Sequence, residues 1–211
     1  MFNARSKIIK KDEDTSELEE EVAKILYDYE MQVKDDSLKK QLVNIHIAAV
    51  EDFTVTERNE EQSKCLLVRI PYRSLLAFRR IRHFLISHLE RKMNCTVLVV
   101  AVRKILSRSA KGGDAHKRPR SRTLTAVHEA LLEDIALPAN IVGRQIRVHT
   151  DGSKSTKVFL DPLDKDKVED RLDAMSEAYR RVTNKRVKFL FAKPTTFQKA
   201  LAEFKKKQKG Q

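Results

Sequence analysis

The segment of residues 103–122 holds the side chains with the clearest capacity for chemistry. Eight of its 20 residues are lysine or arginine and only one is acidic, while Gly112, Gly113 and Pro119 disfavour regular structure. Guanidinium groups pair with phosphate oxygens two at a time, and lysines add mobile positive charges. The composition therefore predicts an irregular basic loop that binds a polyanion. A solvated surface loop and a nuclear-localisation signal remain alternatives, because residues 116–122 would serve as either.

RNA is the polyanion that suits such a loop best. Folded RNA presents closely spaced phosphates and narrow crevices that a flexible basic segment can enter. The loop contains no aromatic residue, so recognition of backbone and shape is expected rather than base stacking. The predicted phosphate-binding cations of the loop are Arg103, Lys104, Arg108, Lys111, Lys117, Arg118, Arg120 and Arg122.

The common signatures of catalysis and of metal binding are missing from the sequence. The chain has five glycines, and none form the GxGxxG or GxxxxGK[ST] patterns that cradle phosphates. His128-Glu129 begins a zinc-protease motif, but Leu132 stands where the second histidine ligand would be. The acidic residues within 161–170 lack the EF-hand spacing and suit the first turns of a helix better. We therefore expect a protein that is not an enzyme and that has no cofactor, metal ion or small-molecule substrate.

Charge is distributed unevenly along the chain, whose formal net charge is +13. Residues 1–62 contain 9 basic and 16 acidic residues, whereas residues 63–211 contain 34 basic and 14 acidic ones. Such a dipolar chain is expected to place one face on a polyanion, either nucleic acid or an acidic membrane, and another toward water or protein. No apolar run approaches the roughly 18 residues that span a bilayer, and residues 1–11 do not resemble a secretory signal. We therefore expect no membrane partner and a cytosolic or nuclear location.

The basic loop is preceded by alternating helical and extended patterns. The predicted elements are a helix over 18–33, strands over 42–55 and 65–70, a helix over 72–93 and a strand over 96–102. The last of these strands, TVLVVAV, is almost entirely apolar and rich in β-branched residues, which is typical of a strand buried on both faces. A strand, a helix and a strand in this order predict that the two strands are parallel neighbours.

The loop is followed by a second set of elements and a lysine-rich end. These are a helix over 124–135, strands over 145–150 and 156–160, a helix that begins at Pro162, and a strand over 187–192. The Asp151-Gly152 pair between two strands is a strong hairpin signal. The sum predicts an α+β fold. It would be a single domain over residues 1–194, with a mixed β-sheet of five or six strands and packed helices, followed by a Lys-rich C-terminal extension over 195–211.

Several stretches of the chain carry a family resemblance. Residues 117–134 read KRPRSRTLTAVHEALLED, residues 141–148 read IVGRQIRV, and residues 157–161 read KVFLD. In this order they resemble the eukaryotic family of small-subunit ribosomal protein seven, and residues 7–10 (KIIK) are similar to its start. The lysine-rich end beyond Pro194 extends past the usual terminus of that family.

The resemblance implies a structural constituent of the small (40S) ribosomal subunit that binds its rRNA and neighbouring ribosomal proteins and contributes to translation. It also implies a cytoplasmic location on the ribosome, with assembly into the precursor particle in the nucleolus. The RNA-binding residues that the family motifs carry over are Lys117, Arg118, Arg120, Arg122, Arg144 and Arg147. A dissociable RNA- or chromatin-binding assembly factor remains the alternative, because it would use the same basic loop.

Overall fold

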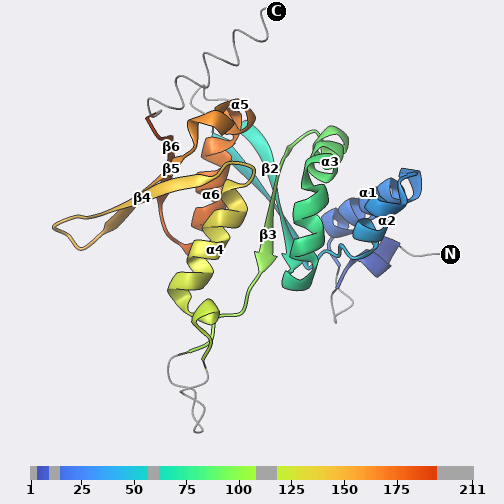
Figure 1. Cartoon of the computed structure of the whole chain (residues 1–211), viewed down its shortest axis with the longest axis horizontal. Helices are drawn as coiled ribbons and strands as arrows, with labels where there is room; N and C mark the ends of the chain where they lie inside the picture. The colour runs from blue at the N-terminus through green and yellow to red at the C-terminus, as the bar shows by residue number, and fades with distance from the viewer. Residues whose placement is uncertain (1–3, 10–14, 57–61, 108–117, 194–211) are drawn as a thin grey trace, which may run out of the picture. The chain divides into compact units, whose positions relative to one another are not determined.

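The computed structural model describes residues 4–9, 15–56, 62–107 and 118–193 (Figure 1). Contacts within the chain group it into two compact units, residues 1–135 and 136–211. The described strands form two three-stranded sheets, one in each unit, with the orders β1-β2-β3 and β4-β5-β6. The α+β class is confirmed, but the strands do not form the predicted single sheet of five or six. The single domain stays a prediction, and the C-terminal extension lies outside the described residues.

The first unit combines helices with a mixed sheet. Its helical elements are η1 (Ala4–Lys7), α1 (Glu17–Gln32), α2 (Asp36–Val43), η2 (Tyr72–Ser74), α3 (Leu75–Met93), η4 (Arg120–Arg122) and α4 (Leu124–Ala136), which ends at the boundary between the units. Its strands are β1 (Ala49–Thr56), β2 (Gln62–Pro71) and β3 (Thr96–Val102). Strand β2 pairs antiparallel with β1 and parallel with β3, so the predicted parallel neighbours are confirmed.

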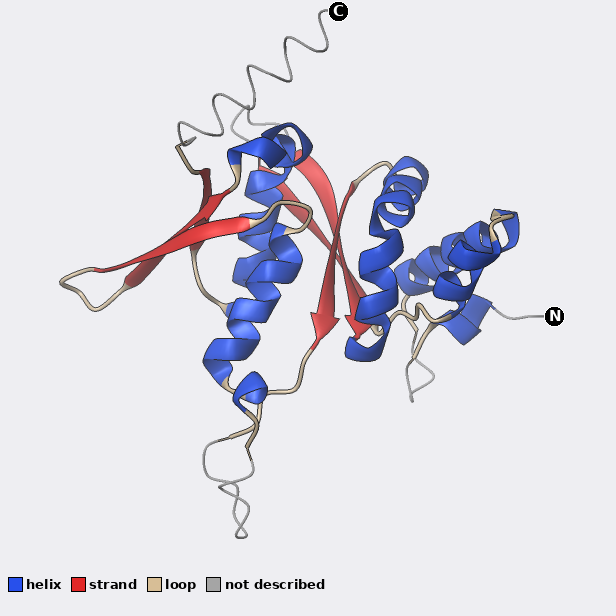
Figure 2. Ribbon diagram, in the orientation of Figure 1, coloured by secondary structure: helices blue, strands red, loops and turns tan. Residues whose placement is uncertain are grey.

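The core of the first unit lies between one face of this sheet and helices α1 and α3 (Figure 2). Val68 of β2 pairs with Val99 of β3, and both point into this core. The strand residues of the core also include Leu66, Ile70, Val97 and Ala101, while the helices contribute Val22, Leu26, Phe78, Ile81, Leu85 and Leu89. The residues on the other face of β3, Leu98 and Val100, are buried too. Strand β3 is therefore buried on both faces, as its composition predicts.

The spacing of the apolar residues in helix α3 predicts a buried stripe made of Leu75, Leu76, Phe78, Ile81, Leu85 and Leu89, and the structure departs from it at one position. Phe78, Ile81 and Leu85 are buried as their spacing predicts, but Leu76 is 66% exposed. Successive helical residues are rotated by about 100°, which places Leu76 on the side of the helix opposite the stripe. The helix ends at Asn94, whose φ of 51° is the left-handed conformation that often closes a helix.

The acidic helix α1 is fixed by its first turn. Ser16 accepts a hydrogen bond from the backbone nitrogen of Glu19, and the Glu19 carboxylate accepts one from the Ser16 nitrogen in return. This reciprocal pair satisfies two backbone donors that a helix start leaves open. Glu19 is buried and also accepts a bond from the Val50 nitrogen of β1. Part of the negative charge of the N-terminal region is therefore used inside the fold.

The strand predicted over residues 42–55 begins later than its apolar pattern suggests. Helix α2 occupies the residues up to Val43, whose side chain is half exposed, and β1 starts only at Ala49. Ile45 and Ile47 are buried in the core from an irregular segment, where Ile47 forms an isolated bridge with Ile8. The alternating apolar pattern predicted correctly that Ile45 and Ile47 are buried, but burial alone does not require a strand.

The second unit contains the remaining described elements. They are β4 (Ile141–Val148), β5 (Lys154–Leu160), η5 (Pro162–Asp164), α5 (Lys165–Val168), η6 (Glu169–Arg171), α6 (Leu172–Thr183) and β6 (Val187–Phe191). Strands β4 and β5 form the hairpin that Asp151-Gly152 predicts, and Gly152 adopts a positive φ of 79° in its turn. Strand β5 pairs parallel with β6.

The helix expected from Pro162 onward is divided into short pieces before α6. Asp161 accepts a hydrogen bond from the Leu163 nitrogen, which caps the first turn. The chain forms the 3-10 turn η6 over Glu169–Arg171 before the regular α-helical turns of α6 begin. Met175 and Tyr179 of α6 are buried, as their spacing of four predicts.

The replacement Val99→Asp should destabilise the protein by at least about 3 kcal/mol, because the new carboxylate would lose water in the core without gaining a partner. Urea unfolding, followed by circular dichroism, measures the change. Val102→Asp is the matched control, since Val102 ends the same strand and is 47% exposed. Equal destabilisation by both substitutions would contradict the burial of β3.

Stability should also fall between about pH 7 and pH 5.5 because of His88. Its ring stacks against Tyr29 of α1 with centroids 4.4 Å apart. Burial, with the charges of Lys92 and Arg91, lowers the pKa of His88 below its ordinary value. The unfolded chain therefore binds the proton more readily, so acid favours unfolding. The substitution His88→Gln should flatten the fall in the thermal midpoint with decreasing pH. The substitution His149→Gln, at an exposed histidine, should not. If wild type and His88→Gln showed the same dependence of the midpoint on pH, His88 would not be the cause of the fall.

Candidate nucleic-acid interface

The two ends of the basic segment meet at its base. Strand β3 leads into residues 103–107, and the chain returns through residues 118–122 to helix α4 (Figure 2). The Leu106 nitrogen donates a hydrogen bond of 3.1 Å to the carbonyl oxygen of Arg122. We call residues 103–107 together with 118–122 the stem. The stem brings cations from both ends of the segment to one place on the first unit.

Thr123 fixes the returning half of the stem to the start of α4. Its hydroxyl donates to the Arg120 carbonyl at 2.7 Å and accepts from the Ala126 nitrogen at 3.4 Å. The first contact closes the short turn η4, and the second satisfies an open donor of the helix. Pro119, with its φ of −63°, precedes the turn. Pro119, the turn η4 and Thr123 together therefore set the positions of Arg120 and Arg122 just before helix α4.

Asp134 is the internal anchor of this region. Its side chain is 1% exposed and lies on α4, yet its partners come from α3 and β3. One carboxylate oxygen accepts from the Arg79 guanidinium at 3.2 Å, and the other accepts from Arg103 and from the Ala101 nitrogen. A buried carboxylate is tolerated only when it is well paired, and three donors provide that pairing. Asp134 therefore holds α3, β3 and α4 in one arrangement.

Arg103 belongs to this internal network. Its side chain is 10% exposed, and its guanidinium bonds to Asp134 and to the Ala101 carbonyl oxygen. The same group lies 5.6 Å from the centre of the Tyr72 ring, a cation–π distance. Arg103 was predicted from the sequence to bind RNA, and that role stays a prediction. Its observed contacts give it a structural role at the foot of the stem.

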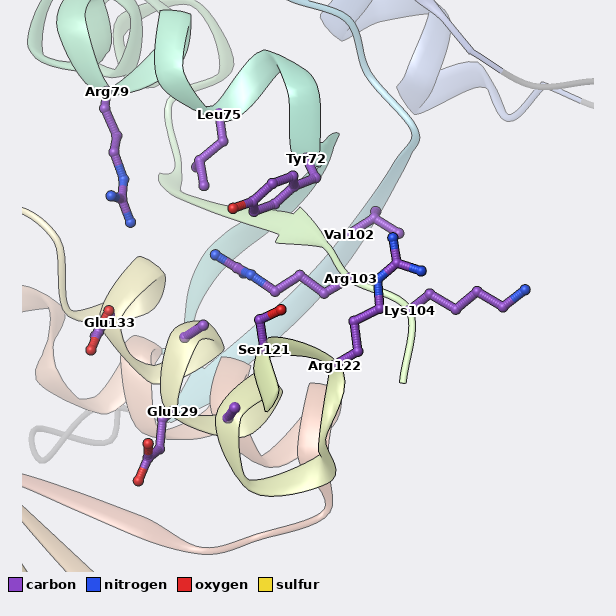
Figure 3. Close-up of a pocket in the computed structure, with 12 residues that line it drawn as sticks. Tyr72, Leu75, Arg79, Val102, Arg103, Lys104, Ser121, Arg122, Glu129 and Glu133 are labelled. Carbon is purple, nitrogen blue, oxygen red and sulfur yellow. The ribbon is translucent and has the colours of Figure 1, made fainter. Parts of the chain in front are cut away.

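A cleft of about 700 Å³ opens beside the stem (Figure 3). We call it the α3–α4 cleft, because those helices and the stem supply its walls. The residues that line it are Tyr72, Leu75, Arg79, Val102, Arg103, Lys104, Ser121, Arg122, Ala126, Glu129, Ala130 and Glu133. Its volume is within the range of small-molecule sites, and its lining combines apolar, basic and acidic side chains.

The structure places the sequence-predicted RNA-binding residues in three groups: those on the stem, those outside the described residues, and those in the second unit. Lys104, Arg120 and Arg122 are exposed on the stem, where Arg118 is half-buried. Lys104 and Arg122 also line the cleft. Arg108, Lys111 and Lys117 lie outside the described residues.

Arg144 and Arg147 belong to the second unit. Both are exposed on β4, where Arg144 pairs with Val158 and Arg147 with Ser155. Because side chains alternate along a strand, these two arginines point to opposite faces of the hairpin. They were predicted together as RNA-binding residues, yet one flat surface cannot contact both in the same way. Both roles stay predictions.

Two functional residues escaped the analysis of the sequence. Tyr72 was assigned only to a helix start, but it is 65% exposed and lines the cleft beside Arg103. Asp134 was noted only as the last residue of a motif. A signal for Tyr72 did exist: it follows Pro71 and lies off the apolar stripe of the helix, as an exposed aromatic residue would.

The described portion of the chain, residues 4–9, 15–56, 62–107 and 118–193, contains neither a metal-ligand cluster nor a membrane-spanning helix. Within that portion, no three or more His, Cys, Asp or Glu side chains gather as a metal site. No helix of that portion combines the length and the apolar character needed to cross a bilayer.

Asp134→Ala should destabilise the protein by about 3 to 5 kcal/mol, because the largely buried Arg103 would lose its counter-charge. Urea unfolding measures the loss. Glu133→Ala is the matched control, since Glu133 is the exposed carboxylate next to it on α4 and should change stability by less than about 1 kcal/mol. A loss below about 1 kcal/mol for Asp134→Ala would show that Arg103 does not depend on this carboxylate.

Comparison with known proteins agrees with the motifs in the sequence. Residues 6–191 match the family described as Ribosomal protein S7e. The chain is 42% identical over 193 residues to "Small ribosomal subunit protein eS7" of Avicennia marina, which covers 90% of this chain and 98% of that protein. It is 40% identical over 193 residues to "Small ribosomal subunit protein eS7z" of Arabidopsis thaliana, covering 90% and 97%. A protein of Schizosaccharomyces pombe with the first of these names is 38% identical, covering 90% and 96%. The chain therefore belongs to the ribosomal protein S7e family.

Proposed function

We propose that this chain is a structural constituent of the eukaryotic small ribosomal subunit that holds small-subunit rRNA by charge and shape. The family assignment covers residues 6–191, and the relatives are named as small-subunit proteins. The single structural observation that supports the proposal is the stem. It presents exposed Lys104, Arg120 and Arg122 together on a support anchored by Asp134.

The stem suits phosphate binding because its exposed cations are not the ones that neutralise Asp134. Arg79 and Arg103 neutralise Asp134 inside the protein, so the exposed stem cations are available to an external anion. Arginine adds paired hydrogen bonds to phosphate, and the Lys104 ammonium adds a less directional charge. The predicted contacts of Arg108, Lys111 and Lys117 would extend this surface along the RNA.

The proposed role needs no catalytic group, cofactor or small-molecule substrate. Its partners would be small-subunit rRNA and neighbouring ribosomal proteins. The place of action would be the cytoplasmic ribosome, after assembly into the precursor particle in the nucleolus. Arg144 and Arg147 would supply a second set of contacts from the hairpin of the second unit.

Reversal of the three arginines in the returning half of the stem tests the proposal. The variant Arg118→Glu, Arg120→Glu, Arg122→Glu should fail to enter small subunits, because rRNA would repel the new carboxylates. The measurement is the fraction of tagged protein that sediments with small subunits from eukaryotic cells. The matched control carries the same charge change at exposed Lys24, Lys39 and Lys40 in the acidic N-terminal region, and it should still enter.

A folding control, the distribution of the wild-type protein and a salt titration complete this test. A cooperative thermal transition of the purified variant shows that its failure to enter is not a failure to fold. Wild-type protein found only in the free pool, or at a small fraction of one copy per mature subunit, would instead indicate a dissociable assembly factor. In vitro, replacing the same arginines with glutamine should reduce the steepness of the salt dependence of RNA binding by about 2 units.

A further inference from the structure

We infer that the α3–α4 cleft receives one unpaired nucleotide of the bound RNA, whose base stacks at Tyr72 and carries an amino group. The inference rests on the proposed function and adds base recognition to backbone recognition. The basic loop contains no aromatic residue, so its sequence gave no reason to expect stacking. The fold places Tyr72, which lies 31 positions before Arg103 in the chain, beside that loop.

Two planar groups lie together at the cleft: the Arg103 guanidinium lies over one face of the Tyr72 ring, and the 65% exposure of Tyr72 leaves its other face open to a base. Figure 3 shows the Tyr72 ring at the wall formed by α3, with the Arg103 side chain extended beneath it and Ser121 on the opposite side. RNA-binding proteins stack unpaired bases on aromatic rings and on arginine guanidinium planes. Arg103 cannot leave easily, because Asp134 holds its guanidinium. The guanidinium that supports the Tyr72 ring is therefore in place before RNA arrives.

The charges of the cleft are separated in the way that a nucleotide requires. Lys104 and Arg122 lie toward one end, while the carboxylates of Glu129 and Glu133 lie toward the other (Figure 3). A nucleotide is likewise polar, with an anionic phosphate at one end and hydrogen-bond donors on the base at the other. Its phosphate would meet the two cations while the base lies between the walls.

The acidic end selects the kind of base. Ionised carboxylates accept hydrogen bonds and donate none. The exocyclic amino groups of guanine, adenine and cytosine are donors, whereas the exocyclic groups of uracil are carbonyl acceptors. Glu133, which lines the cleft, should therefore favour an amino-bearing base over uracil.

Other occupants fit the lining less well. An acidic peptide would be repelled by Glu129 and Glu133, and a paired RNA strand keeps its bases stacked inside the helix. A free nucleotide shares the chemistry of a nucleotide within RNA, but it lacks the neighbouring phosphates that the exposed stem would hold. The cleft and the stem together therefore point to a bulged or looped nucleotide.

Binding of short RNA hairpins to the full chain tests the inference. The probes are identical hairpins that are fully paired or carry one bulged G, A, C or U, and fluorescence anisotropy at fixed salt gives Kd. Bulged G, A or C should bind about 5- to 150-fold more tightly than the paired hairpin, the range expected for stacking of one base. Bulged U should gain less.

Variants identify the residues that carry this preference. Tyr72→Ala should abolish the preference and leave the Kd for the paired hairpin unchanged, whereas Tyr72→Phe should keep it. Glu133→Gln should narrow the difference in Kd between hairpins with a bulged amino-bearing base and the hairpin with a bulged uracil. Phe84→Ala is the matched control, because Phe84 is 55% exposed on α3 and does not line the cleft.

The outcomes separate this inference from the proposed function. Equal Kd values for bulged and paired hairpins overturn the nucleotide site and leave charge-based binding intact. A Tyr72→Ala variant that weakens both probes equally overturns it as well. Free GMP binding as tightly as the bulged-G hairpin would identify a small nucleotide as the occupant and would also refute it. Failure to bind any RNA would overturn both proposals together.

Discussion

The arrangement of the first unit around the stem depends on one buried carboxylate. Asp134 lies on α4 but takes its hydrogen bonds from Arg79 of α3, from Arg103 and from the Ala101 nitrogen of β3. Removing a charge from water is unfavourable unless its partners are present, so the three elements must stay together for the carboxylate to remain buried. Because Arg103 begins the stem, this requirement also fixes where the basic segment leaves the fold.

Burial divides the cations of this protein into two kinds. Arg103 and Lys7 are largely buried and paired with Asp134 and Glu30, so their charges are neutralised within the chain. Arg120 and Arg122 have the same chemistry but are exposed on a short turn. Exposed charges attract an anion at long range and are screened by salt, whereas buried pairs define geometry. The number of lysines and arginines therefore overstates how many cations are available to an external anion.

The acidic N-terminal region shows the same division. Glu19 caps α1 and bonds to the first strand, and Glu30 pairs with Lys7 at 2.6 Å. These carboxylates serve the core rather than a partner, while others on α1 remain exposed.

In the second unit, both arginines of the hairpin are on its surface. The hairpin displays Arg144 and Arg147 on opposite faces, with Ile146 and Val148 exposed beside them. A ribbon of this kind can contact different surroundings on its two sides.

Local patterns in the sequence determined the family, helix α3, strand β3 and the hairpin at Asp151-Gly152. Each of these depends on neighbouring residues, through motif order, helical or strand spacing, or turn geometry. The tertiary structure alone decided that the described strands form two sheets and that residues 42–48 are helical or irregular. It alone also brought Tyr72, Arg103 and Asp134 together. Periodicity reports which face of an element is buried but not which distant element will cover it, so a site assembled from residues 72, 103 and 134 has no local signature.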